Sequence, residues 1–296
     1  MVRPLRSVLI LLLYAVPALC QSRVDCSALK SRILGDSVHY CVLLPPGYDT
    51  VEPKRPAQRF PVLYFLHGLG ANEQTLFNTG GLSVIDEFRE QHKVGNFIMV
   101  TPEARASFYV NSADGKVLYS DFFLQEFIPY IETKYRIDRE REARAISGIS
   151  MGGYGALRFA FLHPELFSAV SAESAALMTE SPEELNAAAR AGTPKSKLLG
   201  SVFGTPLNVK HWKKNDPIVL AQKDQAQLRR LAIYFNCGDH DDFQFDVGAK
   251  KLDQELQAEN IKHEFHLYPG RHDAEYFFSH LSEVLEFHTK AFAASK

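Results

Sequence analysis

The sequence has no excess of either charge and little of several residue types. Its 296 residues include 33 Lys and Arg against 35 Asp and Glu, a formal net charge of −2 at pH 7, with four cysteines, four methionines and one tryptophan. A near-neutral balance provides no basic face, so no nucleic-acid partner is expected. We find no internal repeat or low-complexity segment. An apolar content of 46% and an aromatic content of 11% predict a globular protein with a sizeable core.

Long hydrophobic runs are missing as well, apart from one near the N-terminus. After the basic start MVRPLR comes SVLILLLYAVPAL, an apolar run of about 13 residues, whereas a membrane span needs about 20. This arrangement predicts a secretory signal peptide over residues 1–20, cleaved after Ala18 or after Cys20. The protein is then expected to be secreted or periplasmic, with no stable membrane span. The alternatives are a single membrane anchor and a lipid anchor on Cys20, which the bulky Leu19 disfavours.

Export would leave three cysteines in a compartment where disulfides persist. Cys26 and Cys41 flank a candidate hairpin with a Gly-Asp pair at its turn. A two-residue turn there places Cys41 opposite Lys30 rather than Cys26, so a bridge requires the chain to bend, and its formation stays open. If it forms, closing the loop contributes about 3 kcal/mol. Cys237 ends an apolar run and is expected to be a buried, unpaired thiol.

Short apolar segments typical of strands alternate with helical patterns along most of the chain. The strand candidates are residues 38–45, 61–68, 96–102, 143–150, 167–174, 229–238 and 261–270. Apolar residues recur three and four apart over 121–135, 152–164 and 274–292, which predicts helices. The alternation predicts an α/β fold with a mostly parallel central sheet flanked by helices. Residues 175–220 break the rhythm and are expected to form a cap insertion within a single domain of residues 21–296.

A serine at the end of one predicted strand is the candidate nucleophile. Ser150 is the centre of GISMG at residues 148–152, which matches G-x-S-x-G between an apolar strand and a helix. A serine on such a tight turn adopts strained dihedrals, and small neighbours are needed where the chain passes close to itself. Ser147 lacks this frame. The context therefore favours Ser150 as a nucleophile over a plain structural turn.

A serine hydroxyl needs a base that takes its proton, and eleven histidines compete for this role. His272 follows the last predicted strand and precedes the terminal helix, which places it at the carboxyl end of the sheet. His280 and His288 fall on that helix, where a packed or solvated histidine is expected. His263 and His266 are three apart on a strand and face opposite ways, so they do not form a metal-ligand pair. We therefore predict His272 as the base.

The acid that orients the histidine should follow another strand, between the serine and the histidine in chain order. The segment CGDHDDF at residues 237–243 has this position. Asp239, Asp241 and Asp242 all remain candidates at this point. The spacing lacks the central glycine and the closing glutamate of a calcium loop.

An oxyanion intermediate needs two backbone N–H donors. Met151, directly after the serine, would supply one at the start of a helix. The segment LHGLG at residues 66–70 follows another strand, and its glycines let the backbone approach closely, so Leu69 would supply the other. His67 is a candidate for the substrate pocket, for a base or metal ligand, or for a brace of this loop.

Taken together, these residues resemble a known family. HGLG, FYVNSADG, YSDFFLQEFIPYIE, GISMGGYGAL, FGTP, NDPIVLA, FNCGDHDDF and YPGRHD occur in this order. Their combination, over roughly residues 38–295, resembles the esterase D group of α/β hydrolases, which includes S-formylglutathione hydrolases, feruloyl and acetylxylan esterases, and mycolyltransferases. The resemblance implies an α/β-hydrolase fold.

The resemblance also implies roles for individual residues. The family's nucleophile matches Ser150, its histidine matches His272, and its acid matches Asp241, with the next aspartate as the one-residue alternative. Its oxyanion donors match Leu69 and Met151.

Three further residues are candidates for the substrate pocket. Tyr109 and Asn111 match a loop that lines the acyl pocket of relatives, or they hold that loop. Trp212 in the cap covers the pocket or fastens the cap to the body.

The resulting expectation is a secreted serine esterase that acts through an acyl-enzyme on small-molecule or carbohydrate-linked esters. It needs no metal or organic cofactor. The alternatives are a mycolyltransferase-like acyltransferase and a feruloyl or acetylxylan type of carbohydrate esterase. A cytoplasmic thioester substrate does not fit an exported chain. The sequence indicates no oligomeric state.

Overall fold

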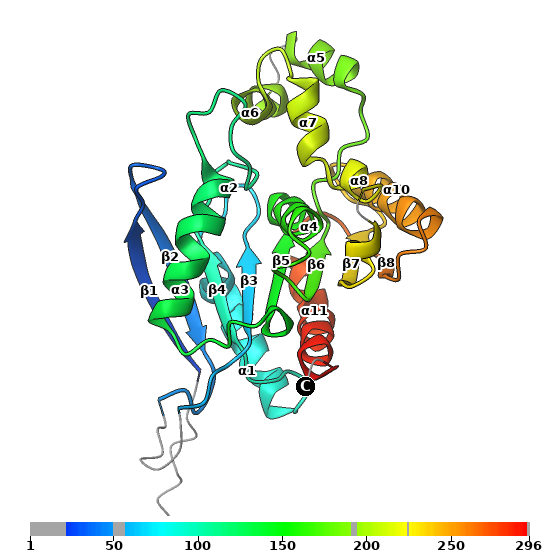
Figure 1. The fold of residues 1–296 in the computed structure, drawn as a ribbon. Coiled ribbons are helices and arrows are strands. Elements are labelled where there is room, and N and C mark those ends of the chain that lie inside the picture. Colours follow the sequence, from blue (N-terminus) through cyan, green and yellow to red (C-terminus); the bar gives the residue numbers. More distant parts are fainter. Residues whose placement is uncertain (1–21, 50–56, 191–193, 224, 295–296) are drawn as a thin grey trace, which may run out of the picture.

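The computed structural model describes residues 22–49, 57–190, 194–223 and 225–294, and the predicted signal peptide lies outside them. Within these ranges one sheet has the strand order β1-β2-β4-β3-β5-β6-β7-β8 (Figure 1). β1 and β2 pair antiparallel, as do β2 and β4, while all other pairs are parallel. The strands are β1 (Arg23–Lys30), β2 (Ser37–Leu44), β3 (Val62–Leu66), β4 (Ile98–Pro102), β5 (Arg144–Ile149), β6 (Ala169–Glu173), β7 (Ala232–Gly238) and β8 (Glu264–Tyr268).

The mostly parallel sheet predicted from the sequence is confirmed, and each of the seven predicted strands is present. β1 was not among the seven apolar strand candidates, although a hairpin was expected between Cys26 and Cys41. Its side chains are exposed or half-buried, so it lacks the apolar pattern that marks the central strands. It extends the sheet at the edge next to β2.

Helices cover both faces of the sheet (Figure 1). Val62, Tyr64 and Leu66 of β3 join the larger core cluster, whereas Leu63 and Phe65 join a second cluster on the opposite face, as the two-residue repeat of a strand requires. The larger cluster packs against α2 (Tyr119–Phe122), η2 (Phe123–Phe127), α3 (Ile128–Lys134), α4 (Met151–Leu162) and α10 (Phe245–Ala258). The second packs against η1 (Phe77–Gly81), α1 (Leu82–Glu90) and α11 (Ala274–Ala294). The short η3 (Arg141–Ala143) leads into β5.

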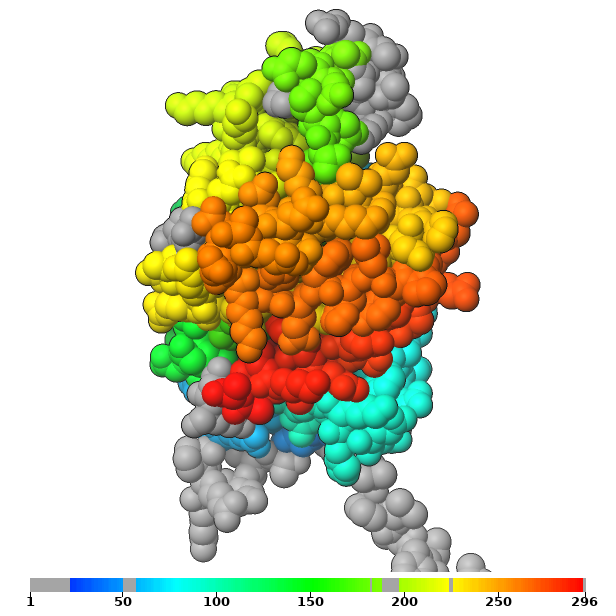
Figure 2. Space-filling model, turned by 90° about the vertical axis from the view of Figure 1, so that its right-hand side faces the viewer, coloured from blue at the N-terminus to red at the C-terminus, as the bar shows by residue number. Residues whose placement is uncertain are grey.

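The chain between β6 and β7, which includes the expected insertion, is mostly helical. Its helices are α5 (Pro182–Arg190), α6 (Pro194–Phe203), α7 (Val209–Asn215), α8 (Pro217–Leu220) and α9 (Gln225–Leu228). In Figure 1, α5, α6 and α7 stand beyond the carboxyl ends of the parallel strands, and in Figure 2 this part projects past α10. Among the described residues, no helix is both long and apolar enough to cross a membrane.

The hairpin of β1 and β2 corrects one expectation. Its turn is not two residues long, because a loop over residues 31–36 joins the strands and places Cys26 directly opposite Cys41, where the two form a disulfide. Glu126 holds the wide loop by accepting hydrogen bonds from the Ser31 hydroxyl at 2.5 Å and from the Arg32 N–H at 3.1 Å. The third cysteine of the predicted mature chain, Cys237, is buried and free, as predicted.

Removing this disulfide is expected to destabilise the protein measurably. The bridge spans 15 residues, and a loop of that length contributes about 3 kcal/mol by restricting the unfolded chain. We expect a Cys26→Ser/Cys41→Ser protein to lose about this much free energy of unfolding in urea titrations. Dithiothreitol should lower the stability of the wild type equally and leave the double variant unchanged. A loss below about 1 kcal/mol would contradict the loop-entropy account.

Candidate active site

Ser150 occupies a strained turn between β5 and α4. Its φ of 56° and ψ of −116° are unusual for a residue with a side chain. The Ser150 N–H donates to the carbonyl of Glu173 at 2.9 Å, and the Ser150 carbonyl accepts from the Ala176 N–H at 3.0 Å. The turn passes so close to β3 that a Cβ on Gly152 would lie 1.9 Å from the carbonyl oxygen of Leu66. Surrounding backbone therefore holds the serine in this conformation.

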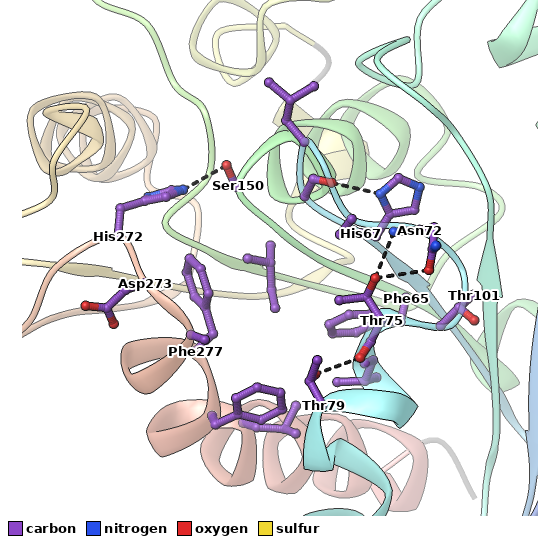
Figure 3. Close-up of a pocket in the computed structure, with 18 residues that line it drawn as sticks. Phe65, His67, Asn72, Thr75, Thr79, Thr101, Ser150, His272, Asp273 and Phe277 are labelled. Atoms are coloured by element: carbon purple, nitrogen blue, oxygen red, sulfur yellow. Dashed lines mark hydrogen bonds between the residues drawn. The ribbon is translucent and has the colours of Figure 1, made fainter.

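His272 lies between β8 and α11, and its two ring nitrogens link Ser150 to Asp241. The Nε2 atom is 2.9 Å from the Ser150 hydroxyl oxygen, and the Nδ1 atom is 2.7 Å from Oδ2 of Asp241 (Figure 3 shows the first of these). The rings of Phe243 and Phe277 meet the imidazole edge to face, with centroids 4.8 and 5.2 Å away. These contacts fix the plane of the imidazole in an apolar setting.

The three candidate aspartates after β7 have separate partners. Asp241 bonds His272, and its Oδ1 also accepts from the backbone N–H of Phe243 at 2.9 Å. Asp242 instead accepts from the Arg271 guanidinium and from the His272 backbone N–H. Asp239 accepts from the N–H of Gly270. Of the three, Asp241 is the one whose carboxylate is bonded to the imidazole.

The environment of Asp241 keeps its carboxylate charged. Burial raises the pKa of Asp241, but the hydrogen bond and the charge of His272, with backbone donors at Phe243 and Phe245, outweigh it and leave the pKa below its ordinary value. The nearby Cys237 thiol, 3.7 Å from Oδ2, has its pKa raised to about 12 by burial and stays protonated. Asp241 is thus the anionic end of the hydrogen-bond chain.

The two predicted oxyanion donors lie on backbone next to Ser150. Met151 is the first residue of α4, where the backbone N–H has no carbonyl one turn earlier to bond. Leu69 lies on the loop after β3, and a Cβ on the preceding Gly68 would lie 3.4 Å from Cβ of Ser150. Among the described residues, neither the Leu69 N–H nor the Met151 N–H has a hydrogen-bond partner. The loop that carries Leu69 thus lies against the turn that carries Ser150 and Met151.

His67 braces this loop and also lines the cavity beside Ser150. Its Nε2 accepts from the N–H of Ala104 at 3.0 Å, so its Nδ1 carries the proton donated to the carbonyl of Gly68 at 2.8 Å. Burial lowers the pKa of His67 despite opposing contributions from Gly68 and Glu103. Both ring nitrogens are therefore committed, which leaves no role for His67 as a base or metal ligand.

The other candidate pocket residues, Tyr109, Asn111 and Trp212, hold a loop or the insertion, which is the second of the two roles considered for each. Tyr109 is fully buried, and its hydroxyl donates to the carbonyl of His67 at 2.9 Å. Asn111 accepts from the N–H of Asp121. Trp212 is buried in the insertion against Phe203, with ring centroids 4.6 Å apart. None of the three lines the cavity at Ser150, because each is committed to holding a loop or the insertion in place.

A cavity of about 330 Å³ opens beside Ser150 and His272, between η1 and α11 (Figure 3). No sequence pattern marks its apolar lining, because core residues show the same pattern. The position of Phe277 just after His272 on a predicted helix was the available clue. The large apolar residues of the lining are Phe65, Leu76, Ile149, Phe277, Phe278 and Leu281. No group of three or more His, Cys, Asp or Glu in the described part of the chain could hold a metal ion.

Glu173, at the end of β6, is a second residue that sequence reasoning missed. It is fully buried beside the Ser150 turn, and neither carboxyl oxygen has a hydrogen-bond partner among the described residues. Burial, reinforced by Glu283 and opposed by the nearby amide of Asn236, raises the pKa of Glu173 to about 8. A neutral carboxylic acid therefore lies next to the turn at pH 7.

This raised pKa predicts a pH dependence of stability. As the pH rises from about 4.5 to about 8, the unfolded chain releases the Glu173 proton while the folded protein retains it, so stability falls across this window. We expect Glu173→Gln to remove up to roughly 3.5 kcal/mol of this loss in urea titrations between pH 5 and pH 8. Glu283→Gln, which removes one contributor, should produce a smaller change. Parallel stability profiles for wild type and Glu173→Gln would show that Glu173 titrates normally.

The sequence and the structure of the chain are similar to those of known esterases. The Esterase family model matches residues 31–288. An esterase of Mycobacterium tuberculosis is 27% identical over 246 residues, which cover 78% of this chain and 51% of the relative. The solved structure of a ferulic acid esterase superposes with a TM-score of 0.77 and 30% identity, covering 92% of this chain and 99% of that one. An S-formylglutathione hydrolase of Staphylococcus aureus shares the fold, with a TM-score of 0.73 at 22% identity and coverages of 91% and 99%.

The chain belongs to the Esterase family.

Membership of the Esterase family confirms the resemblance seen in the sequence and the predicted α/β-hydrolase fold. It assigns the described domain to the carboxylic ester hydrolases. The chain spans about half the length of the mycobacterial esterase that it matches.

Proposed function

We propose that this protein is a serine esterase that hydrolyses carboxylic esters through an acyl-enzyme on Ser150. The observation that carries the proposal is the continuous hydrogen-bond chain from the Ser150 hydroxyl through His272 to Asp241 at a strained strand-to-helix turn. A serine, a histidine and a carboxylate in this order form the arrangement that turns a weak hydroxyl into a nucleophile. Small-molecule esters and carbohydrate-linked esters are both within this reaction class.

In the first half-reaction, the Ser150 oxygen attacks the ester carbonyl carbon while Nε2 of His272 takes the hydroxyl proton. Asp241 holds the imidazole through Nδ1 and stabilises its positive charge. The N–H groups of Leu69 and Met151 donate to the oxygen that becomes negative. The intermediate collapses when the C–O bond to the alcohol breaks and the alcohol leaves with the proton from His272.

In the second half-reaction, water takes the place of the alcohol. His272 removes a proton from the water, which attacks the acyl carbon of the acyl-enzyme. Collapse of this second intermediate returns the proton to Ser150 and releases the carboxylic acid. The residues of the chain itself carry every step, so neither half-reaction requires a metal ion or an organic cofactor.

We further propose that the protein acts outside the cytoplasm, as one hydrolase domain over residues 21–296. The Cys26–Cys41 disulfide supports this location, because such bridges persist in oxidising compartments. The apolar segment at the N-terminus supports it as well. Expression of the full chain in a secreting host, followed by N-terminal sequencing of the protein in the medium, tests the location. Retention of the intact N-terminus inside the cell would contradict it.

The acyl-enzyme mechanism is tested by labelling the purified protein with a fluorophosphonate and identifying the modified peptide by mass spectrometry. We expect one equivalent of label on the peptide that contains Ser150. A burst of p-nitrophenol at the start of p-nitrophenyl ester hydrolysis, equal to the enzyme concentration, would report the acyl-enzyme whenever deacylation is slow. Label on another residue, with ester hydrolysis intact, would overturn the assignment of Ser150.

A further inference from the structure

We propose that the cavity between η1 and α11 binds the acyl group of the ester and selects unbranched aliphatic acyl chains of about six to ten carbons. This inference rests on the proposed serine esterase mechanism and adds the substrate class. Three observations carry it: the position of the cavity at the nucleophile, the chemistry of its walls and its volume.

The cavity starts at the reacting groups. Ser150 and His272 line one end, and Thr79 lies at the other end in Figure 3, with Phe277 between them. The walls come from the sheet face that carries Phe65 and from the first turns of α11. A chain attached to the Ser150 oxygen can therefore extend along the cavity without rearrangement of the described backbone.

The hydroxyl groups in the walls are already engaged within the protein. Thr75 donates to Oδ1 of Asn72 at 3.0 Å and accepts from the N–H of the same residue at 2.9 Å. Thr79 donates to the carbonyl of Thr75 at 2.6 Å, and Thr101 donates to the carbonyl of Glu73 at 2.6 Å. The remaining wall is predominantly aromatic and aliphatic, so it favours an acyl group without polar substituents.

Polar and charged acyl groups meet unfavourable surroundings here. A hydroxycinnamoyl group would bring a phenolic hydroxyl into a wall whose own hydroxyl groups, on Thr75, Thr79 and Thr101, already donate within the protein. A dicarboxylic acyl group would meet Asp273, the acidic residue in the described lining, and no cationic side chain other than a protonated histidine. Both kinds of acyl group are expected to react more slowly than an alkanoyl group of similar size.

The volume sets the expected chain length. An apolar cavity of about 150 Å³ lined by aliphatic and aromatic side chains accommodates the six carbons of benzene. The present cavity of about 330 Å³ is slightly more than twice as large. It therefore has room for an alkanoyl chain of about six to ten carbons, with the longest chains filling it.

The apolar walls of the cavity assign it to the acyl group rather than to the alcohol. Water must enter the position that the alcohol leaves, beside Nε2 of His272, for deacylation to occur. Apolar walls offer water few hydrogen bonds, whereas the acyl group must remain in place through both half-reactions. The apolar cavity therefore suits the part of the substrate that stays bound.

The first experiment compares kcat/KM over p-nitrophenyl esters from acetate to laurate and over acetate esters of alcohols of rising length. For the wild type we expect kcat/KM to rise with acyl length by up to about fourfold per methylene, peak between hexanoate and decanoate and then fall. The alcohol series should vary far less, and methyl ferulate should be a poorer substrate than methyl octanoate. A flat acyl profile, a preference for ferulate or a dependence on alcohol length alone would each overturn the inference.

Matched variants on α11 test the assignment to the cavity. Phe278 and Phe287 are both half-buried and both pack against the second core cluster, but Phe278 lines the cavity and Phe287 does not. We expect Phe278→Ala to move the optimum to longer chains and Phe287→Ala to leave it unchanged. Leu281→Phe should reduce the octanoate-to-acetate ratio of kcat/KM at least tenfold. Equal profiles for Phe278→Ala and Phe287→Ala would overturn the assignment even if Leu281→Phe fails to fold.

Deacylation rates separate the acyl group from the alcohol, because the acyl-enzyme no longer contains the alcohol. We expect the Phe278→Ala profile to shift in single-turnover deacylation as it does in kcat/KM, and an unshifted deacylation profile would overturn the acyl assignment. Failure of the proposed function would look different. No ester of any length would then be hydrolysed, and fluorophosphonate would not label Ser150.

Discussion

Replacing Ser150 with alanine is expected to lower kcat for p-nitrophenyl ester hydrolysis by about 10⁴- to 10⁶-fold. The Ser150 oxygen lies 2.9 Å from Nε2 of His272, and its loss removes the nucleophile that would form the acyl-enzyme. Residual hydrolysis would come from water held near the oxyanion donors at Leu69 and Met151. The variant should also lose all labelling by fluorophosphonate.

Ser147, three residues earlier and within β5, provides a matched control. It is fully buried, and its hydroxyl accepts from Ser171 at 2.7 Å on the far side of the sheet from α4. Ser147→Ala removes one buried hydrogen bond, so we expect a stability loss of about 1 kcal/mol with kcat within about twofold of wild type. Full hydrolysis by Ser150→Ala, or an equal loss in both variants, would refute the mechanism.

Changing Asp241 to asparagine is expected to lower kcat by about 10⁴-fold. Oδ1 of Asp241 accepts from the N–H of Phe243, so an asparagine would keep its oxygen there and turn its amide group toward His272. The imidazole would then have to accept at Nδ1 and carry its proton on Nε2. A protonated Nε2 cannot take the proton of Ser150.

Asp242 supplies the control for this variant because it is the adjacent aspartate and is bonded to different groups. Its carboxylate accepts from Arg271 and from the backbone N–H of His272, not from the imidazole. We expect Asp242→Asn to reduce kcat by no more than about tenfold, by loosening the loop that holds His272. Steady-state kinetics of both variants, with circular dichroism to verify folding, make the comparison. A larger loss in Asp242→Asn would show that the wrong aspartate had been assigned.

The apolar patterns in the sequence predicted the central strands because a parallel sheet is buried on both faces, and buried strands are continuous apolar runs. β1 was absent from the apolar strand candidates for the opposite reason, since it is an edge strand with a mostly exposed surface. The turn of the β1–β2 hairpin was predicted too short because local sequence patterns do not contain contacts with distant residues. The length of the loop depends on Glu126, which is about 90 residues away in the chain and therefore outside any local pattern.

The sequence by itself determined Ser150 and His272 as candidates, because a strand-to-helix turn with glycines and a loop at a strand end are local features. It could not choose among Asp239, Asp241 and Asp242 without the family resemblance, because that choice depends on which carboxylate reaches the imidazole from another strand. Tertiary structure also decided that Tyr109 and Trp212 are packed away from the cavity, and that Phe65 and Leu281 meet beside Ser150. The physical reason is the same in each case: a cavity is the space that remains after distant segments pack, and no single segment encodes its walls.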